Sequence, residues 1–351
     1  DREWYQSFQN FRYQLVRLLD RVIEGLEDGR LRGPFQTDGQ AIILEDYLEI
    51  RPDRREQLQR LARDGKVVIG PWYVLPDEFL VSGESLIRNI RLGRQIARSF
   101  GTQPSNAGFV CDLFGHNSQI PQIFASFGIH GGLIWRGINH LQSRHVRWRG
   151  ADGTEMVAYR FPGGGYCDYT FAVRHAREHQ LGVTTASVNH DLDEYLRYEA
   201  EHTEVDPILL FDGGDHEEWD QTTYRGLLGY ADNGNDDFEV VHTSLDAYLA
   251  EVLPQAERIQ TIVQGELRAP GTDYYDQQWV IPGVLSSRVW IKQANAECET
   301  LLCQWAEPFS AWAHLNLGAE PPQGFLDASW KWLLQNHPHD SICGCSIDVV
   351  H

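Results

Sequence analysis

Short apolar segments alternate with helical patterns along most of this chain, and this alternation constrains the fold more than any other feature. The apolar segments lie at residues 66–70, 107–111, 131–135, 156–161, 208–211 and 238–242. Helical periodicity is found at 4–30, 55–63, 84–100, 119–127 and 183–201. Such an order is typical of βα units, in which each helix returns the chain to the next strand of a parallel sheet. The sequence therefore predicts an α/β fold.

The pattern changes at Pro282-Gly283, and from Val284 onward it is purely helical. One apolar stripe consists of Cys298, Leu301, Leu302, Trp305, Phe309, Trp312 and Leu315. A second stripe consists of Phe325, Leu326, Trp330, Leu333 and Leu334. Stripes at this spacing predict a helical bundle packed on the α/β part. We therefore expect an α/β domain at 1–270 and a helical domain at 283–351.

The charge balance excludes several classes of partner. Fifty Asp and Glu residues face 30 Lys and Arg residues, which gives a formal net charge of −20. Nucleic acids and anionic membranes bind clustered cationic side chains, so neither is expected as a partner. The chain lacks an apolar run long enough to span a bilayer. Its scattered cysteines form no disulfide framework, which favours a reducing, cytoplasmic setting. The sequence allows a homo-oligomer.

Acidic residues follow two of the predicted strands, where parallel α/β folds bind their ligands. Asp112 comes directly after 107–111, and Asp215 follows 208–211 across a Gly-Gly turn. A pair of carboxylates can act as nucleophile and acid/base in glycoside hydrolysis. A structural alternative exists for each: Asp112 can cap a helix or turn, and Glu217-Glu218 suggest a solvated acidic loop.

A second cluster of chemical interest lies close to the end of the chain. His337, His339 and Asp340 lie within four positions, just after the last helical stripe. Imidazole and carboxylate groups are ordinary zinc ligands, so a metal site and a structural role are equally open here. Cys343 and Cys345 are a rival ligand set, although a C-x-C pair alone is more typical of two small buried thiols.

Several motifs, in the same order along the chain, resemble glycoside hydrolase family 38, the α-mannosidases. They are Asp1-Arg2-Glu3-Trp4-Tyr5, Gly70-Pro71-Trp72-Tyr73, Asp77-Glu78, Asp112-Leu113-Phe114-Gly115-His116, Gln119-Ile120-Pro121-Gln122, Trp135-Arg136-Gly137, Leu285-Ser286-Ser287-Arg288 and His337-Pro338-His339-Asp340-Ser341-Ile342. The last motif is the most specific, and the resemblance covers nearly the whole chain.

The resemblance implies a seven-stranded parallel α/β barrel followed by a three-helix bundle, with one Zn²⁺ held by two His and two Asp. Asp1, Asp112 and His339 match three of these ligands. The fourth, a His, would lie two positions before the first residue, and the first barrel strand would precede it. The large C-terminal β-domains of the family are also missing from this sequence. We therefore expect a fragment that is cut at both ends.

The resemblance also implies a role for each site residue. Asp112 would be the nucleophile as well as a zinc ligand, and Asp215 would be the general acid/base. Trp72, Asp77 and Arg136 would line the sugar pocket. The expected reaction is the retaining hydrolysis of terminal α-mannosides or mannose-containing oligosaccharides by double displacement.

Three alternatives stay open beside the general α-mannosidase. The forms of Asp1–Tyr5 and His337–Ile342 are similar to the bacterial branch of the family, which includes mannosylglycerate hydrolases. A zinc polysaccharide deacetylase would share a similar barrel and an Asp/His metal site, but it would not explain His337–Ile342 inside a helical domain. A carbohydrate-binding protein without turnover is the alternative from a different functional class.

Overall fold

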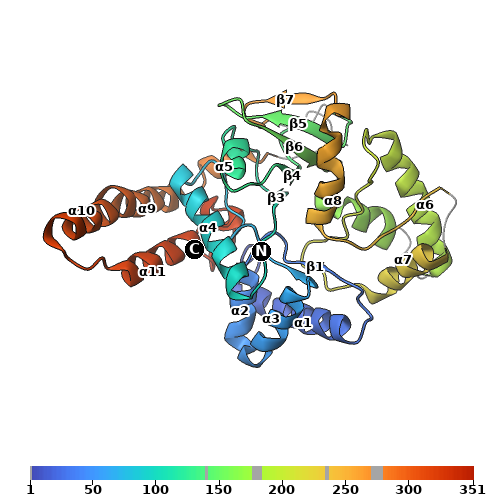
Figure 1. Ribbon diagram of the computed structural model, residues 1–351, viewed down its shortest axis with the longest axis horizontal. Coiled ribbons are helices and arrows are strands. Elements are labelled where there is room, and N and C mark those ends of the chain that lie inside the picture. Colours follow the sequence, from blue (N-terminus) through green and yellow to red (C-terminus); the bar gives the residue numbers. More distant parts are fainter. Residues whose placement is uncertain (1, 139–140, 176–183, 234–236, 270–279) are drawn as a thin grey trace.

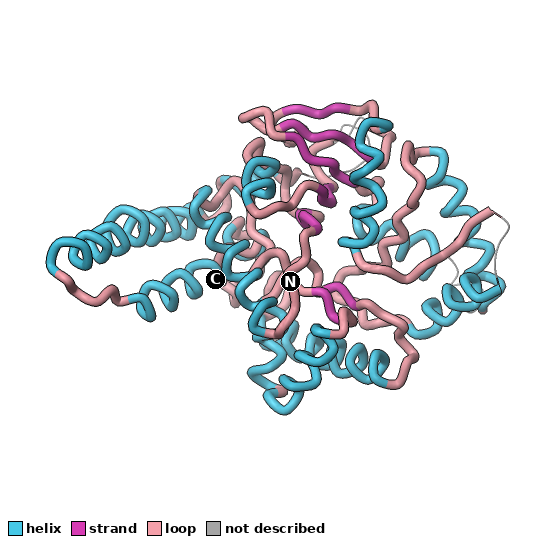
Figure 2. Tube along the Cα trace, in the orientation of Figure 1, coloured by secondary structure: helices cyan, strands magenta, loops and turns pink. Residues whose placement is uncertain are grey.

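The computed structural model describes residues 2–138, 141–175, 184–233, 237–269 and 280–351. The strands run from the middle of the molecule to its upper edge, and helices lie on both sides of them (Figure 2). A helical arm projects from one side (Figure 1). The fold is therefore mixed α/β. Among the described residues, no helix combines the length and the apolar character that crossing a bilayer requires.

The described strands form two sheets. The first pairs β1 (Phe35–Gln36) with β2 (Val67–Val68) in parallel. The second has the order β3-β4-β6-β5-β7, with β3 at Ala107–Val110, β4 at Gly131–Ile134, β6 at Glu155–Arg160, β5 at His145–Arg149 and β7 at Ile262–Gln264. The second sheet is mixed, because β5 runs antiparallel to β6. The closed, seven-stranded parallel barrel stays a prediction.

Two predicted strands are wrong. The segments 208–211 and 238–242 contain no strand. Their apolar side chains, including Ile208, Leu210 and Phe238, instead pack against a small core cluster around Tyr169. Periodicity indicates that such side chains are buried, but it does not indicate whether the backbone is hydrogen-bonded to a neighbouring strand.

Helices fill the space around the sheets. In chain order they are α1 (Phe8–Glu27), α2 (Ile42–Ile50), α3 (Arg55–Arg63), α4 (Gly83–Ser99), α5 (Ile120–Ser126), α6 (Thr185–Glu201), α7 (Gln221–Asn233) and α8 (Leu245–Val252). The α3 helix has the predicted bounds, whereas α2, α7 and α8 were not predicted. The α2 helix buries residues around most of its circumference, including Ile42, Leu44, Asp46 and Tyr47, so its sequence lacks a clear amphipathic stripe.

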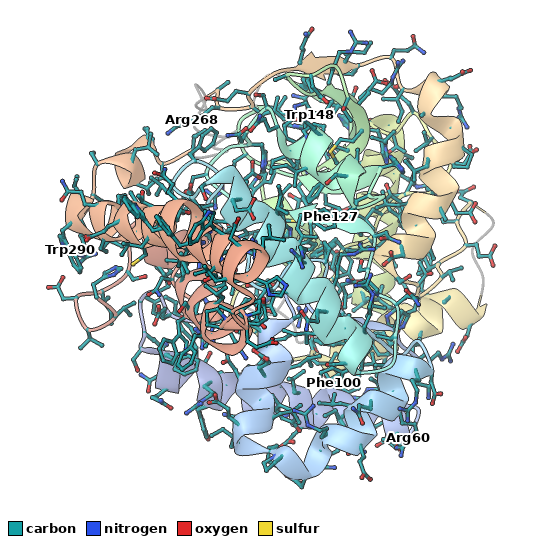
Figure 3. The ribbon with its side chains drawn as sticks, turned by 60° about the vertical axis from the view of Figure 1, so that its left-hand side comes forward. Arg60, Phe100, Phe127, Trp148, Arg268 and Trp290 are labelled. Carbon is teal, nitrogen blue, oxygen red and sulfur yellow. The ribbon has the colours of Figure 1, made fainter. Side chains whose placement is uncertain are left out.

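The C-terminal part is helical, as predicted, but most of the first apolar stripe is exposed and only its Leu302 is buried. This part contains α9 (Val289–Thr300), a π-helical segment (Leu301–Ala306), α10 (Glu307–Leu317), α11 (Gln323–Leu334) and α12 (His339–Ile342). Trp305, Phe309 and Trp312 are each more than half exposed, and Trp290 lies on the outer side of the arm (Figure 3). By contrast, α11 buries Trp330, Leu333 and Leu334 against the core. Both stripes were predicted to pack on the α/β part, and this is correct only for the second stripe, which lies on α11.

Gly93 allows α4 to pack closely against the segment that follows β2. A Cβ atom at Gly93 would overlap the carbonyl carbon and oxygen of Trp72, which are backbone atoms that no rotamer change can move. We expect Gly93→Ala to lower the free energy of unfolding by about 3 kcal/mol or more. Gly83 begins the same helix and has open space around it, so Gly83→Ala is the matched control. Equal urea midpoints for the two variants would contradict this packing.

Candidate active site

The Asp112 carboxylate lies just beyond the carboxyl end of β3, between two cationic or potentially cationic side chains. Arg136, which follows β4, donates from Nη2 to Asp112 Oδ1 at 2.5 Å. His339 Nε2 lies 3.0 Å from Asp112 Oδ2. The side chain of Asp112 is 18% exposed, so a ligand can still reach it. The structure therefore brings three of the predicted site residues together.

The loop after α11 fixes His339 against the segment that follows β2. The His339 amide donates to the Leu75 carbonyl at 3.1 Å, and the Asp77 amide donates to the His337 carbonyl at 3.1 Å. Nδ1 of His339 lies 3.4 Å from the same Leu75 oxygen. A carbonyl can only accept, so Nδ1 carries the proton and Nε2 faces Asp112.

The electrostatics of this pair favour a cation. Burial lowers the pKa of His339, but the charges of Asp340 and Asp112 outweigh burial and raise it to about 10. Burial also opposes ionisation of Asp112, yet the His339 hydrogen bond and Arg136 bring the Asp112 pKa well below its usual range. The two carboxylates beside His339 thus favour a positive charge at its imidazole.

These atoms fit part of a zinc site. An imidazole nitrogen and a carboxylate oxygen converge, and a backbone carbonyl orients the imidazole from its other side, as in many zinc centres. Asp1, the third predicted ligand, lies outside the described residues. The nearby Glu3 is hydrogen-bonded to Ser341 at 3.0 Å.

Asp215 follows the 208–211 segment and is held by a tyrosine. Tyr166, in the short 3-10 turn Gly165–Cys167 after β6, donates from its hydroxyl to Asp215 Oδ1 at 2.7 Å. Burial raises the pKa of Tyr166, and the charges of Asp112 and Asp215 raise it further. Both carboxylates therefore act on the same phenol. Asp215 itself is exposed.

Sequence analysis missed Tyr166 and Asp38. The signal for Tyr166 was a glycine-rich loop directly after a predicted strand. Asp38 lies in the tight turn after β1, at φ 51°, where the Gln40 amide donates to the Thr37 carbonyl at 2.9 Å. Burial raises the pKa of Asp38, with further contributions from Asp112 and Asp215, so a third acid lies near the two predicted ones.

Trp72 and Asp77, two of the predicted sugar contacts, are both buried. Trp72 is fully buried, and its indole N–H donates to the Phe109 carbonyl at 2.8 Å. Asp77 is also buried, and its Oδ1 accepts from the amides of Phe79 and Leu80 at 2.8 and 3.0 Å. That Trp72, Asp77 and Arg136 line the sugar pocket stays a prediction.

Two family models match this chain, one over each of its two parts. The model of the glycosyl hydrolases family 38 N-terminal domain matches residues 1–266, and that of the alpha mannosidase middle domain matches residues 281–351. The chain belongs to glycoside hydrolase family 38. This confirms the resemblance inferred from the motifs.

Family 38 relatives are similar to this chain over most of its length. A "Putative mannosylglycerate hydrolase" of Halalkalibacterium halodurans is 30% identical over 364 residues, which cover 100% of this chain and 39% of that protein. "Alpha-mannosidase 2C1" of Homo sapiens is 28% identical over 320 residues, which cover 89% of this chain and 28% of that protein. The chain thus spans well under half of either relative.

A solved family 38 structure has the same fold. The crystal structure of an alpha-mannosidase from Enterococcus faecalis V583 superposes with a TM-score of 0.89 at 31% sequence identity. The match covers 100% of this chain and 38% of that one. The mixed α/β arrangement that brings Asp112 and His339 together is therefore that of a family 38 α-mannosidase.

Proposed function

We propose that this chain is the catalytic part of a zinc-dependent, retaining α-mannosidase that cleaves terminal α-mannosides. The observation that carries the proposal is the convergence of Asp112, Arg136 and His339 at one edge of the sheet. The proposal includes the seven-stranded barrel, with a catalytic domain at 1–270 and a helical domain at 283–351. The six free cysteines support a reducing, cytoplasmic setting.

The zinc ion would be held by His339, Asp112 and Asp1. When bound, it would supply a fixed positive charge that orients the sugar hydroxyls. Arg136 holds Asp112 Oδ1, so the carboxylate keeps one orientation throughout. Since Asp112 would be both ligand and nucleophile, its position is the most constrained in the site.

The reaction would take two steps. In the first, an Asp112 oxygen forms a bond to the anomeric carbon while the bond to the leaving oxygen breaks, and Asp215 gives that oxygen a proton. In the second, Asp215 takes a proton from water, the water oxygen bonds to the anomeric carbon, and Asp112 is released. Two inversions give net retention, which requires the carboxyl groups to be roughly 5 Å apart.

The stereochemical course tests this proposal. We expect 4-nitrophenyl α-D-mannopyranoside to release α-mannose first, as followed by proton NMR before mutarotation. Removing the metal with a chelator is expected to stop turnover, and Zn²⁺ should restore it. If β-mannose forms first, the double displacement is excluded. If chelation leaves the rate unchanged, the zinc assignment is excluded.

One relative favours a second candidate within the same family. The Halalkalibacterium halodurans protein carries a mannosylglycerate hydrolase name and is 30% identical to this chain. Mannosylglycerate would use the same carboxylates, but its aglycone is an anion. A kcat/KM for mannosylglycerate well above that for an aryl α-mannoside would support the narrower function.

Tyr166 is expected to position the acid/base. The Tyr166→Phe variant loses a hydrogen bond to a carboxylate, and we expect kcat/KM to fall by about 10-fold or more. The matched control is Tyr169→Phe, because the buried hydroxyl of Tyr169 has no hydrogen-bond partner among the described residues. Steady-state kinetics of both variants check this, and equal rates for the two would contradict the positioning role.

A further inference from the structure

A compact group of ligand-type atoms lies next to the proposed catalytic centre. It consists of Asp340, Cys343 and Cys345, and one ligand atom from each lies within 4.8 Å of the others. The Cys345 thiol donates to Asp340 Oδ1 at 3.1 Å. Three such atoms at this separation can bind one metal ion, because neighbouring ligands of a tetrahedral zinc are between about 3 and 4 Å apart at the usual metal–ligand distances.

The backbone holds this group in place. After the short α12 helix, Gly344 adopts φ 76° and turns the chain so that Cys345 returns to Asp340. The Gly344 carbonyl accepts from Arg288 Nη1 at 2.5 Å and from Ser287 Oγ at 3.0 Å. Ser346 Oγ donates to the Asp340 carbonyl at 2.8 Å. These contacts hold the loop in one conformation, and such an ordered loop lowers the entropic cost of binding a metal.

Access and environment suit a thiophilic ion. Cys343 is fully buried in a small cluster with Phe114 and Val284, whereas Cys345 is exposed. An ion can therefore enter past Cys345 and rest against an apolar wall, where charge interactions are strong. Thiolate ligands select zinc-like and cadmium-like ions over magnesium or calcium.

The charges also balance. Two thiolates and the Asp340 carboxylate carry three negative charges, and Lys292 donates from Nζ to the Cys343 carbonyl at 2.7 Å. A divalent ion together with this ammonium group would neutralise them. Hydrogen bonding with Cys343 and burial raise the pKa of the Cys345 thiol, so an incoming ion must displace protons.

We propose that Asp340, Cys343 and Cys345 form a second cation site, distinct from the proposed catalytic zinc, which takes a thiophilic divalent ion such as Zn²⁺ or Cd²⁺. A fourth position is left for water. Asp340 Oδ2 lies 3.6 Å from His339 Nε2, so an ion bound to Asp340 also acts on the catalytic centre. Occupancy is therefore expected to inhibit turnover.

Cadmium titration of the full chain tests this site directly. The cadmium–thiolate bond absorbs in the ultraviolet, and nitrogen and oxygen ligands of a catalytic site do not produce this band. We expect the wild-type chain to develop the band with one equivalent of Cd²⁺. The Cys345→Ser variant should need at least ~10-fold more Cd²⁺, since one of three protein ligands is lost.

Cys298→Ser provides the control, because Cys298 is exposed and lies outside the group. It should bind Cd²⁺ like the wild type, and circular dichroism establishes that each variant is folded. No thiolate band in the wild type, or an unchanged titration in Cys345→Ser, would overturn the second site. The band does not depend on mannoside turnover, so failure of the proposed function leaves this result distinguishable.

Discussion

Replacing Asp112 by alanine is expected to lower kcat/KM for an aryl α-mannoside by roughly 10⁴- to 10⁶-fold, the range found when a hydrolase loses its nucleophile or the carboxylate that supports it. The physical reason is twofold. The variant lacks the oxygen that would attack the anomeric carbon, and it also lacks a carboxylate beside His339 Nε2.

A second substitution separates chemistry from folding. Asp112→Asn keeps an oxygen that can accept from Arg136, so the fold should survive, yet an amide is a poor nucleophile and a poor zinc ligand. Asp206→Ala is the control, because the Asp206 carboxylate forms an exposed ion pair with Arg258, and such pairs contribute little. Activity close to wild type in either Asp112 variant would remove the proposed nucleophile.

Replacing Asp215 by alanine is expected to slow cleavage of substrates with poor leaving groups by about 10²- to 10⁴-fold, the usual contribution of general acid catalysis. A dinitrophenyl mannoside has a leaving group that needs no proton, so its first step should be nearly unaffected. Measuring both substrates with the same variant distinguishes loss of the acid from loss of binding.

The leaving-group comparison has a clear contrary outcome. If Asp215→Ala slows both substrates equally, Asp215 contributes to binding or structure and a different residue provides the proton. A small anion such as azide should accelerate the second step in the variant, because it can attack the anomeric carbon without general-base help. No acceleration by azide would further weaken the assignment.

The sequence predicted much of the site because strand ends can be located from periodicity. Asp112 follows an apolar strand, and the structure has that strand as β3. Asp215 follows an apolar segment that is not a strand, yet the segment still brings it to Tyr166. Periodicity alone could not join Asp112 to His339 across 227 positions, and only the motif resemblance predicted that pair.

Other features depend on packing that no local pattern encodes. Trp72 follows the strand β2 and is buried, and Gly93 allows α4 to approach the Trp72 backbone closely. The apolar stripe at Trp305 and Phe309 correctly predicts a helix, whereas periodicity does not specify what covers that stripe. The burial of Trp72 and the exposure of this stripe both depend on how elements pack against one another, and a local sequence pattern does not encode such packing.

Trapping the covalent intermediate is the most direct test of the account. In a 2-deoxy-2-fluoro mannosyl donor the fluorine slows both steps, and a good leaving group keeps the first step fast enough for the intermediate to accumulate. Mass spectrometry of peptides can then locate the sugar. The account predicts one fluoromannosyl group, attached to the peptide that contains Asp112. A label on a different carboxylate, or turnover with inversion and no label, would contradict it.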